Sequence, residues 1–174
     1  MKQYWLFVMM LLVTAFCSVT VWAQEVNEAI TPTTPTERFT LNGDGTVTDT
    51  LTGLMWQQCS QGQTWSAEGC SGSMTPFSWQ LALQQAQTVN DSAELGYDDW
   101  RLPNIKELGS IVEISCYDPA VNLDVFPETP SSDFWSSSYA ADSDGAWHLN
   151  FGNGYNNNAS KNNDYAVRLV RGGQ

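Results

Sequence analysis

An asparagine-rich tract, residues 153–164, holds most of the side chains in this chain that could recognise a ligand. Its amides each donate and accept hydrogen bonds, which suits neutral, hydroxyl-rich or mixed ligands. Two tyrosines and a lysine could add apolar contact and one positive charge. The candidate ligand-binding residues are Tyr139, Asn153, Tyr155, Asn156, Asn157, Asn158, Lys161, Asn162 and Asn163. The alternative is a solvated loop, because asparagine also tolerates the left-handed backbone of turns.

Two runs of alternating apolar residues flank this tract. They are Trp147, Leu149, Phe151 and Tyr165, Val167, Leu169. Strict alternation is typical of a half-buried strand, because successive side chains point to opposite faces of a sheet. The tract is therefore predicted to be displayed between packed strands. Trp135 and Trp147 could stack on a sugar ring or lie in the core, and the alternation favours the core for Trp147.

Catalytic side chains are sparse in this sequence. A nucleophile among Ser136, Ser137 and Ser138 lacks the flanking glycines of a nucleophile elbow, and a Ser-His-Asp set would need His148, the one histidine. No visible pattern places His148 beside Cys116 for cysteine chemistry. We therefore expect a protein without enzymatic activity.

No cofactor is expected, although calcium is an alternative at two places. Asn42 and Asp44 echo part of an EF-hand loop, but the first and last ligand positions of such a loop are not acidic here. Asp142, Asp144 and Asn150 could form a calcium site like that of sugar-binding lectins. The same Asp-Ser-Asp-Gly segment is equally typical of a hairpin turn.

The N-terminal residues 1–23 have the features of a signal peptide: Lys2, an apolar stretch and a small-residue cleavage site at Ala23. A retained signal anchor is the alternative. The following residues 24–37, rich in threonine and proline, are predicted to be a flexible tether. Residues 38–174 are predicted to form one domain. We expect an exported protein, secreted, periplasmic or on the cell surface, without stable membrane insertion after cleavage.

Charge limits the partners of the mature chain. Removal of Lys2 with the signal peptide takes the formal net charge from −12 to −13. So acidic a protein is not expected to bind nucleic acid, because phosphate backbones require a cationic surface. An extracellular glycan or protein is the expected partner, and the oligomeric state is left open.

Three cysteines remain after residue 23, and an oxidising compartment would allow one disulfide among them. Cys59 and Cys70 bracket a short polar loop, so we favour this pair over either pairing with Cys116. Closing such a loop stabilises a fold by about 3 kcal/mol on the chain-entropy model. Cys116 would then be a buried small residue or an intermolecular partner.

Two helices and a hairpin are predicted in the domain. Apolar residues from Trp79 to Val89 recur at helical spacing. A second helix opens at Asn104, which can form a capping box with Glu107. It is predicted to run on through Ile111 and Val112, and as an open alternative to Ser115. Arg101 is expected to pair with a carboxylate at the turn that enters this helix. Glycines at positions 43 and 45 predict a hairpin turn between residues 40–41 and 46–48.

Several separated motifs occur in the order found in the Lcl C-terminal domain-like family. They are Asn42-Gly43-Asp44-Gly45-Thr46-Val47-Thr48-Asp49, Thr52-Gly53-Leu54-Met55-Trp56, Trp100-Arg101-Leu102-Pro103, Phe134-Trp135-Ser136-Ser137-Ser138 and Val167-Arg168-Leu169-Val170-Arg171-Gly172-Gly173-Gln174. The chain resembles this family over about residues 38–174, essentially the whole predicted domain.

This resemblance implies an α+β, C-type-lectin-like fold, with two helices packed beside a small twisted antiparallel sheet. Trp100, Trp135 and Arg168 are then expected to be structural. The family takes its name from a bacterial collagen-like adhesin whose domain binds sulfated glycans. Collagen-like Gly-X-Y repeats are missing here, and Lys161, Arg168 and Arg171 are the few local cations that could meet a sulfate.

We therefore expect a ligand-binding or adhesion protein that uses its C-terminal loops. One alternative is a structural component of a cell-surface assembly. Another follows from a similarity to lectin-like variable proteins that are diversified by retroelements, in which mutated adenines concentrate near the C-terminus. Asparagine codons are rich in adenine, and seven asparagines lie between residues 150 and 163.

Overall fold

Small antiparallel sheets and two α-helices make up an α+β fold in the computed structural model, which describes residues 24–141 and 144–172. The predicted signal peptide, residues 1–23, lies outside the described residues. The elements in chain order are β1 (Glu25–Val26), η1 (Thr36–Arg38), β2 (Phe39–Leu41), β3 (Thr46–Asp49), β4 (Met55–Gln57), β5 (Thr64–Ser66), β6 (Gly69–Ser71), α1 (Trp79–Asp91), η2 (Glu94–Gly96), α2 (Ile105–Gly109), β7 (Cys116–Tyr117), β8 (Asp133–Ala140), β9 (Gly145–Asn150), β10 (Asn156–Ser160) and β11 (Val170–Arg171). None of the described helices is long and apolar enough to cross a membrane.

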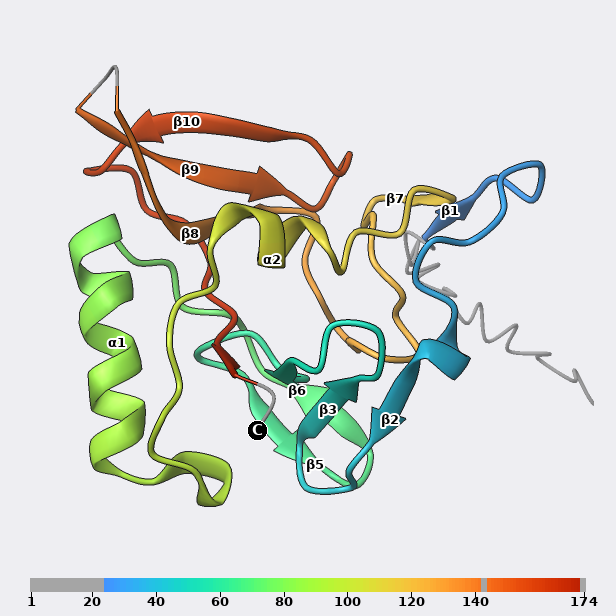
Figure 1. The fold of residues 1–174 in the computed structure, drawn as a ribbon, viewed down its shortest axis with the longest axis horizontal. Helices are drawn as coiled ribbons and strands as arrows, with labels where there is room; N and C mark the ends of the chain where they lie inside the picture. Colours follow the sequence, from blue (N-terminus) through green and yellow to red (C-terminus); the bar gives the residue numbers. More distant parts are fainter. Residues whose placement is uncertain (1–23, 142–143, 173–174) are drawn as a thin grey trace, which may run out of the picture.

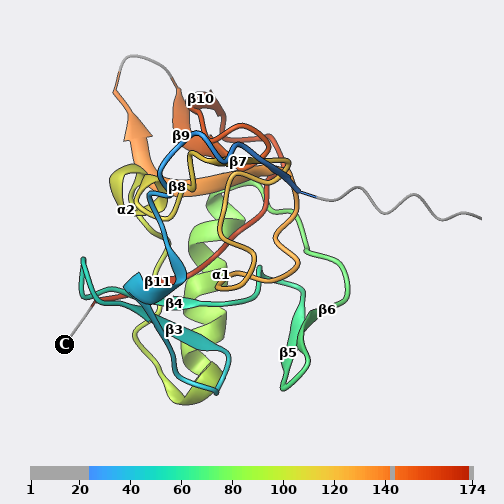
Figure 2. The same ribbon diagram turned by 90° about the vertical axis from the view of Figure 1, so that its right-hand side faces the viewer.

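Two sheets organise the domain. A three-stranded sheet in the order β10-β9-β8 lies at one end, and a four-stranded sheet in the order β11-β4-β3-β2 lies below it in both views (Figures 1 and 2). The β2–β3 hairpin forms at the turn that the sequence predicts, where Gly43 and Gly45 both have positive φ. Such φ values favour glycine because it has no Cβ to clash.

The two helices flank these sheets, with α1 along one side and α2 beside β8 and β9 (Figure 1). The capping box is present: Asn104 accepts from the Glu107 backbone N–H, and the Glu107 carboxylate accepts from the Asn104 N–H. The predicted extent of α2 is wrong, since it ends at Gly109. Beyond it, Val112 pairs with Val121 instead, so a non-local strand-like contact replaces the last helical turns.

The C-terminal segment forms the centre of the core. The predicted alternation fails after Tyr165, because residues 166–170 are all buried, whichever way they point. This segment runs between two hydrophobic clusters, so both of its faces are covered. Arg168 is the polar member of the run. Its guanidinium is fully buried, donates to Thr129 Oγ1 over 2.7 Å, and lies over the Phe126 ring.

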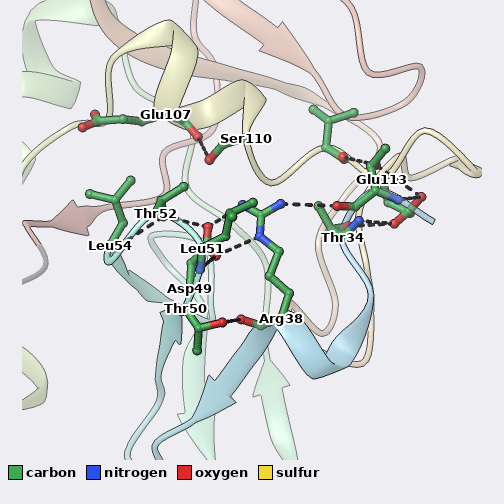
Figure 3. A network of polar contacts seen from close by, with 12 residues as sticks. Thr34, Arg38, Asp49, Thr50, Leu51, Thr52, Leu54, Glu107, Ser110 and Glu113 are labelled. Atoms are coloured by element: carbon green, nitrogen blue, oxygen red, sulfur yellow. Dashed lines mark hydrogen bonds and ion pairs between the residues drawn. The ribbon is translucent and has the colours of Figure 1, made fainter. Parts of the chain in front are cut away.

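The prediction of a flexible tether is wrong, because residues 24–37 pack against the domain. Glu113 accepts hydrogen bonds from the backbone N–H groups of Thr33 and Thr34, at 3.0 and 2.7 Å. Thr34 is fully buried, and Arg38 next to it pairs with Asp49 of β3 (Figure 3). Composition alone suggested flexibility, but a carboxylate about 80 residues away supplies the partners that order this segment.

The Cys59–Cys70 disulfide is confirmed, with a Cα–Cα separation of 5.5 Å. It joins the end of β4 to the short β5–β6 hairpin, where Cys70 pairs across the strands with Trp65. Cys116 is a free, partly buried thiol. Burial raises the pKa of this thiol above its usual value.

Candidate functional site

The centre of the asparagine-rich tract is a strand rather than the predicted loop. Residues Asn156–Ser160 form β10, which pairs along its whole length with β9. The strand order places β10 at the edge of its sheet. Hydrogen bonds to β9 fix the backbone of the tract, so its side chains are held in a defined register.

The exposed asparagines of β10 divide between the two faces of the sheet. Asn156 and Asn158 lie opposite Leu149 and Trp147, whereas Asn157 lies opposite His148. All three asparagines are exposed, and Asn157 uses its Oδ1 to accept from the Asn158 backbone N–H over 2.8 Å. Asn156 and Asn158 make no side-chain hydrogen bond within the described residues. Their amides are therefore open to an external partner.

The β9–β10 turn presents one of the two tyrosines. Tyr155 is 76% exposed and follows Gly154, whose backbone fits closely because a Cβ there would lie 2.9 Å from Val112. Asn153 and Asn150 hold the turn, since Asn153 Oδ1 accepts from the Tyr155 N–H and Asn150 Oδ1 accepts from the Asn153 N–H. Asn153, predicted to bind ligand, therefore has a structural use for its amide oxygen.

The other end of β10 leads to Lys161. Its Nζ lies 4.7 Å from the ring centroid of Tyr139 and 5.1 Å from that of Trp79, within the range of cation–π contact. Asp144 Oδ1 lies 3.2 Å from the same nitrogen. A surface cavity of 320 Å³ opens here between the start of α1 and the end of β10. Trp79 and Asp144 belong to this end, and the sequence pattern had marked Trp79 only as a helix residue.

The turn after β10 is exposed as well. Asn162 and Asn163 are both accessible, and Asn163 Nδ2 donates to the Tyr165 hydroxyl over 2.9 Å. Asn162 lines the same cavity as Lys161. Asn162 is therefore the freer of the two side chains.

Tyr139 and Tyr155 lie near opposite ends of β9. Tyr139 pairs with Ala146, and Tyr155 adjoins Asn150 at the far end of β9. Four residues along a strand span about 13 Å. The structure therefore does not bring the two rings into one pocket, and it offers a shallow strip with an aromatic group near each end.

The residues predicted to be structural have defined partners. Trp100 and Trp135 are buried, with their indole N–H groups donating to the carbonyls of Glu94 and Phe77. Arg101 makes two hydrogen bonds of 2.7 Å to the Glu107 carboxylate. This contact raises the pKa of Arg101.

Trp147 differs from its prediction as a core residue. It is only partly buried and belongs to neither hydrophobic cluster. At this end of β9 the opposite face is the covered one, where Ala146 and His148 are buried. His148 packs against Trp135 and Tyr165, two rings that also contact each other, and burial lowers the pKa of His148.

The cations offer little to a sulfated ligand. Arg168, counted among the local cations, is fully buried, and burial lowers its pKa to about 9. Arg171 is paired with Asp99 over 2.6 Å, and Lys161 with Asp144. The strip is therefore suited to neutral groups rather than to a polyanion.

The residues of the two calcium alternatives can be placed in part. The side chains of Asp44 and Asn42 both form hydrogen bonds with the Thr46 hydroxyl in the hairpin turn. Asp144 and Asn150 lie at opposite ends of β9, and Asp142 lies outside the described residues. No group of three or more acidic, histidine or cysteine residues in the described ranges is arranged to hold a metal ion.

Comparison with known families fits the order of motifs along the chain. The model of the Lcl C-terminal domain matches residues 45–171, which is well over half of the chain. The chain belongs to the Lcl C-terminal domain family. A search of the curated proteins finds no match. The match spans β3, β4 and β11 of the four-stranded sheet, both α-helices and the whole β10-β9-β8 sheet, so the candidate site lies inside the family domain. Membership suggests an adhesin-like role without naming a ligand.

Proposed function

We propose that this domain is an exported, C-type-lectin-like adhesion module without enzymatic activity. It holds a neutral extracellular glycan, or a protein displaying one, along the β10 strip. Here the β10 strip means Tyr155 to Asn158 together with the Tyr139–Lys161–Asn162 end. Binding is direct and does not use calcium.

One observation carries the proposal. Asn156 and Asn158 have open amides on an edge strand whose backbone is fixed by β9. An exposed tyrosine lies near each end of this strand, and Tyr139 is on the sheet face opposite to the two asparagines, because it pairs with Ala146. Because the backbone of β10 is already ordered, binding restricts only the side chains, which lowers the entropic cost of association. Tyrosine adds apolar contact with a polar tip, as at many recognition surfaces.

A glycan array with and without EDTA tests this proposal. We expect binding to a subset of neutral glycans, with signals unchanged by EDTA. Replacing Asn156 to Asn158 together by alanine should weaken binding at least about tenfold, since the loss of one or two net hydrogen bonds corresponds to about 1–3 kcal/mol.

Matched controls separate binding from folding. Gln87→Ala removes an exposed amide in the second half of α1, away from β10, and should leave binding unchanged. Tyr117→Ala does the same for a half-exposed tyrosine on β7. The proposal fails if the β10 variant binds like the wild type, or if both control variants weaken binding equally.

An assembly component is the second candidate, and the open edge of β10 favours it. An edge strand presents unpaired backbone groups that can pair with a strand of another chain. The glycan array distinguishes the two, because a purely structural component would show no glycan signal and would associate with itself or with another surface protein.

If a retroelement diversifies this gene, only some of the seven asparagines between residues 150 and 163 should vary. Asn150 bonds to Asp133 and supports the turn, so it should stay constant in any diversified set. Asn156, Asn158 and Asn162 are the positions that could vary freely. A template repeat and a reverse transcriptase beside the gene would support this alternative, and their absence from the genome would dispose of it.

A further inference from the structure

A second pocket, of 360 Å³, lies in a different part of the domain from the β10 strip. Its walls come from the β2–β3 turn, the end of β4 with the loop that follows, strand β5 and the short η2 helix. The β5 hairpin and the β8–β10 sheet lie at different ends of the molecule (Figure 2). The volume falls within the range of small-molecule sites.

Gly45 lets these walls meet. Its φ is +90°, and a Cβ there would lie 2.9 Å from the Trp65 ring and 3.2 Å from Leu95. The Trp65 ring and Leu95 of η2 therefore both pack against the backbone of Gly45 in the hairpin turn. The approach is tight enough that no other residue fits without moving a wall.

A chain of glutamines orients the polar wall. Gln85 Nε2 donates to Gln61 Oε1 over 2.9 Å, and Gln61 Nε2 donates in turn to Gln57 Oε1. Both acceptor oxygens are thereby used. The Nε2 of Gln57, a side chain that is 2% exposed, is left without a hydrogen-bond partner among the described residues. A buried donor of this kind gains from an added acceptor.

Other lining residues supply an aromatic ring and a carboxylate. Trp65 is partly exposed, and the exposed residue Glu94 also lines the pocket. Glu94 is held between Ala93 and Leu95, two non-glycine residues with φ of +48° and +55°. Such left-handed residues are costly, and they gather where a segment must present a group to a ligand.

We propose that this pocket binds one neutral sugar ring. A sugar hydroxyl oxygen accepts from Gln57 Nε2, the apolar face of the ring rests on Trp65, and another hydroxyl donates to the Glu94 carboxylate. The described lining contains no lysine or arginine, so it offers nothing to hold an anionic sugar. The site goes beyond the proposed adhesion function, because it shares no residue with the β10 strip.

NMR titration of the isotope-labelled mature chain tests the pocket. The probes are glucose, galactose, mannose and N-acetylglucosamine, each as free sugar and as methyl glycoside. At least one should give saturable shifts at the Trp65 indole N–H and the Gln57 side-chain amide. Equal binding of the methyl glycoside identifies a terminal glycan residue as the natural source, whereas binding of the free form alone identifies a monosaccharide.

Variants decide whether the shifts report this pocket. Trp65→Ala should weaken binding about tenfold or more, while Trp65→Phe keeps a stacking ring and should stay within about threefold. Glu94→Gln should weaken it severalfold, and Glu68→Gln, an exposed carboxylate on the same hairpin, should not. The proposal is overturned if no probe shifts the pocket resonances even at sugar concentrations well above millimolar, or if the shifts fall on β10 alone. It is also overturned if Trp65→Ala and Glu94→Gln both bind like the wild type.

Discussion

Replacing Glu113 by glutamine should remove a pH-dependent part of the stability of this domain. Glu113 is buried and accepts hydrogen bonds from Ser115, Thr34 and Thr33. Burial alone would raise its pKa, but these hydrogen bonds outweigh burial and lower the pKa from 4.5 to about 2. Each pKa unit corresponds to about 1.4 kcal/mol, so the ionised form contributes on the order of 3 kcal/mol.

The sign of the effect follows from the lowered pKa. An acid whose pKa is lower in the folded state stabilises the fold above its unfolded pKa, and it loses this contribution as the pH falls towards the folded pKa. The contribution of Glu113 is thus complete above about pH 5 and is largely lost near pH 2.

Urea unfolding of the wild type and of Glu113→Gln between pH 7 and pH 2 measures this directly. The gap in unfolding free energy should narrow by about 3 kcal/mol towards pH 2, because the other carboxylates are common to both proteins. Glu68→Gln, an exposed control, should show no such narrowing. A gap that stays constant with pH would refute the reasoning.

Three further predictions concern local stability. Replacing both Cys59 and Cys70 by serine should lower the unfolding free energy by about 3 kcal/mol, and no change in urea unfolding would contradict this. Gly154→Ala should destabilise more than Gly43→Ala, because both have positive φ but only the first would place a Cβ within 2.9 Å of a neighbouring atom. Equal melting temperatures for the two variants would count against it. Glu107→Ala should cost about 1–2 kcal/mol by calorimetry, since it removes both the capping box and an ion pair, and a loss below a few tenths would show that neither matters.

Local signals in the sequence predicted much of the fold. The β2–β3 hairpin follows from the positive φ of Gly43 and Gly45, and the start of α2 from Asn104 and Glu107. Each of these features depends on residues within a few positions of one another. The disulfide was accessible for the same reason, because Cys59 and Cys70 close a short loop.

Long-range contacts explain what the sequence could not show. Thr34 is ordered by Glu113, a partner that no nearby pattern indicates. The end of α2 is set by the pairing of Val112 with Val121, and the C-terminal run around Arg168 is covered on both sides by elements from across the chain.

The candidate site shows the same division. The exposure of Tyr139 and Tyr155 and the polarity of the tract were predictable from residue type. That the asparagines form an edge strand was not, because asparagine is rare in strands and the register comes from β9. The separation of the two tyrosines by the length of β9 also required the paired structure.

The most direct test of the account is to map a glycan from the array onto the labelled protein by NMR. We expect the largest shifts on the backbone amides of Tyr155 to Asn158 and on the side-chain amides of the three asparagines, with smaller shifts at Lys161. Shifts spread over α1 or the four-stranded sheet, with the β10 amides unmoved, would contradict the assignment of this strip as the binding surface.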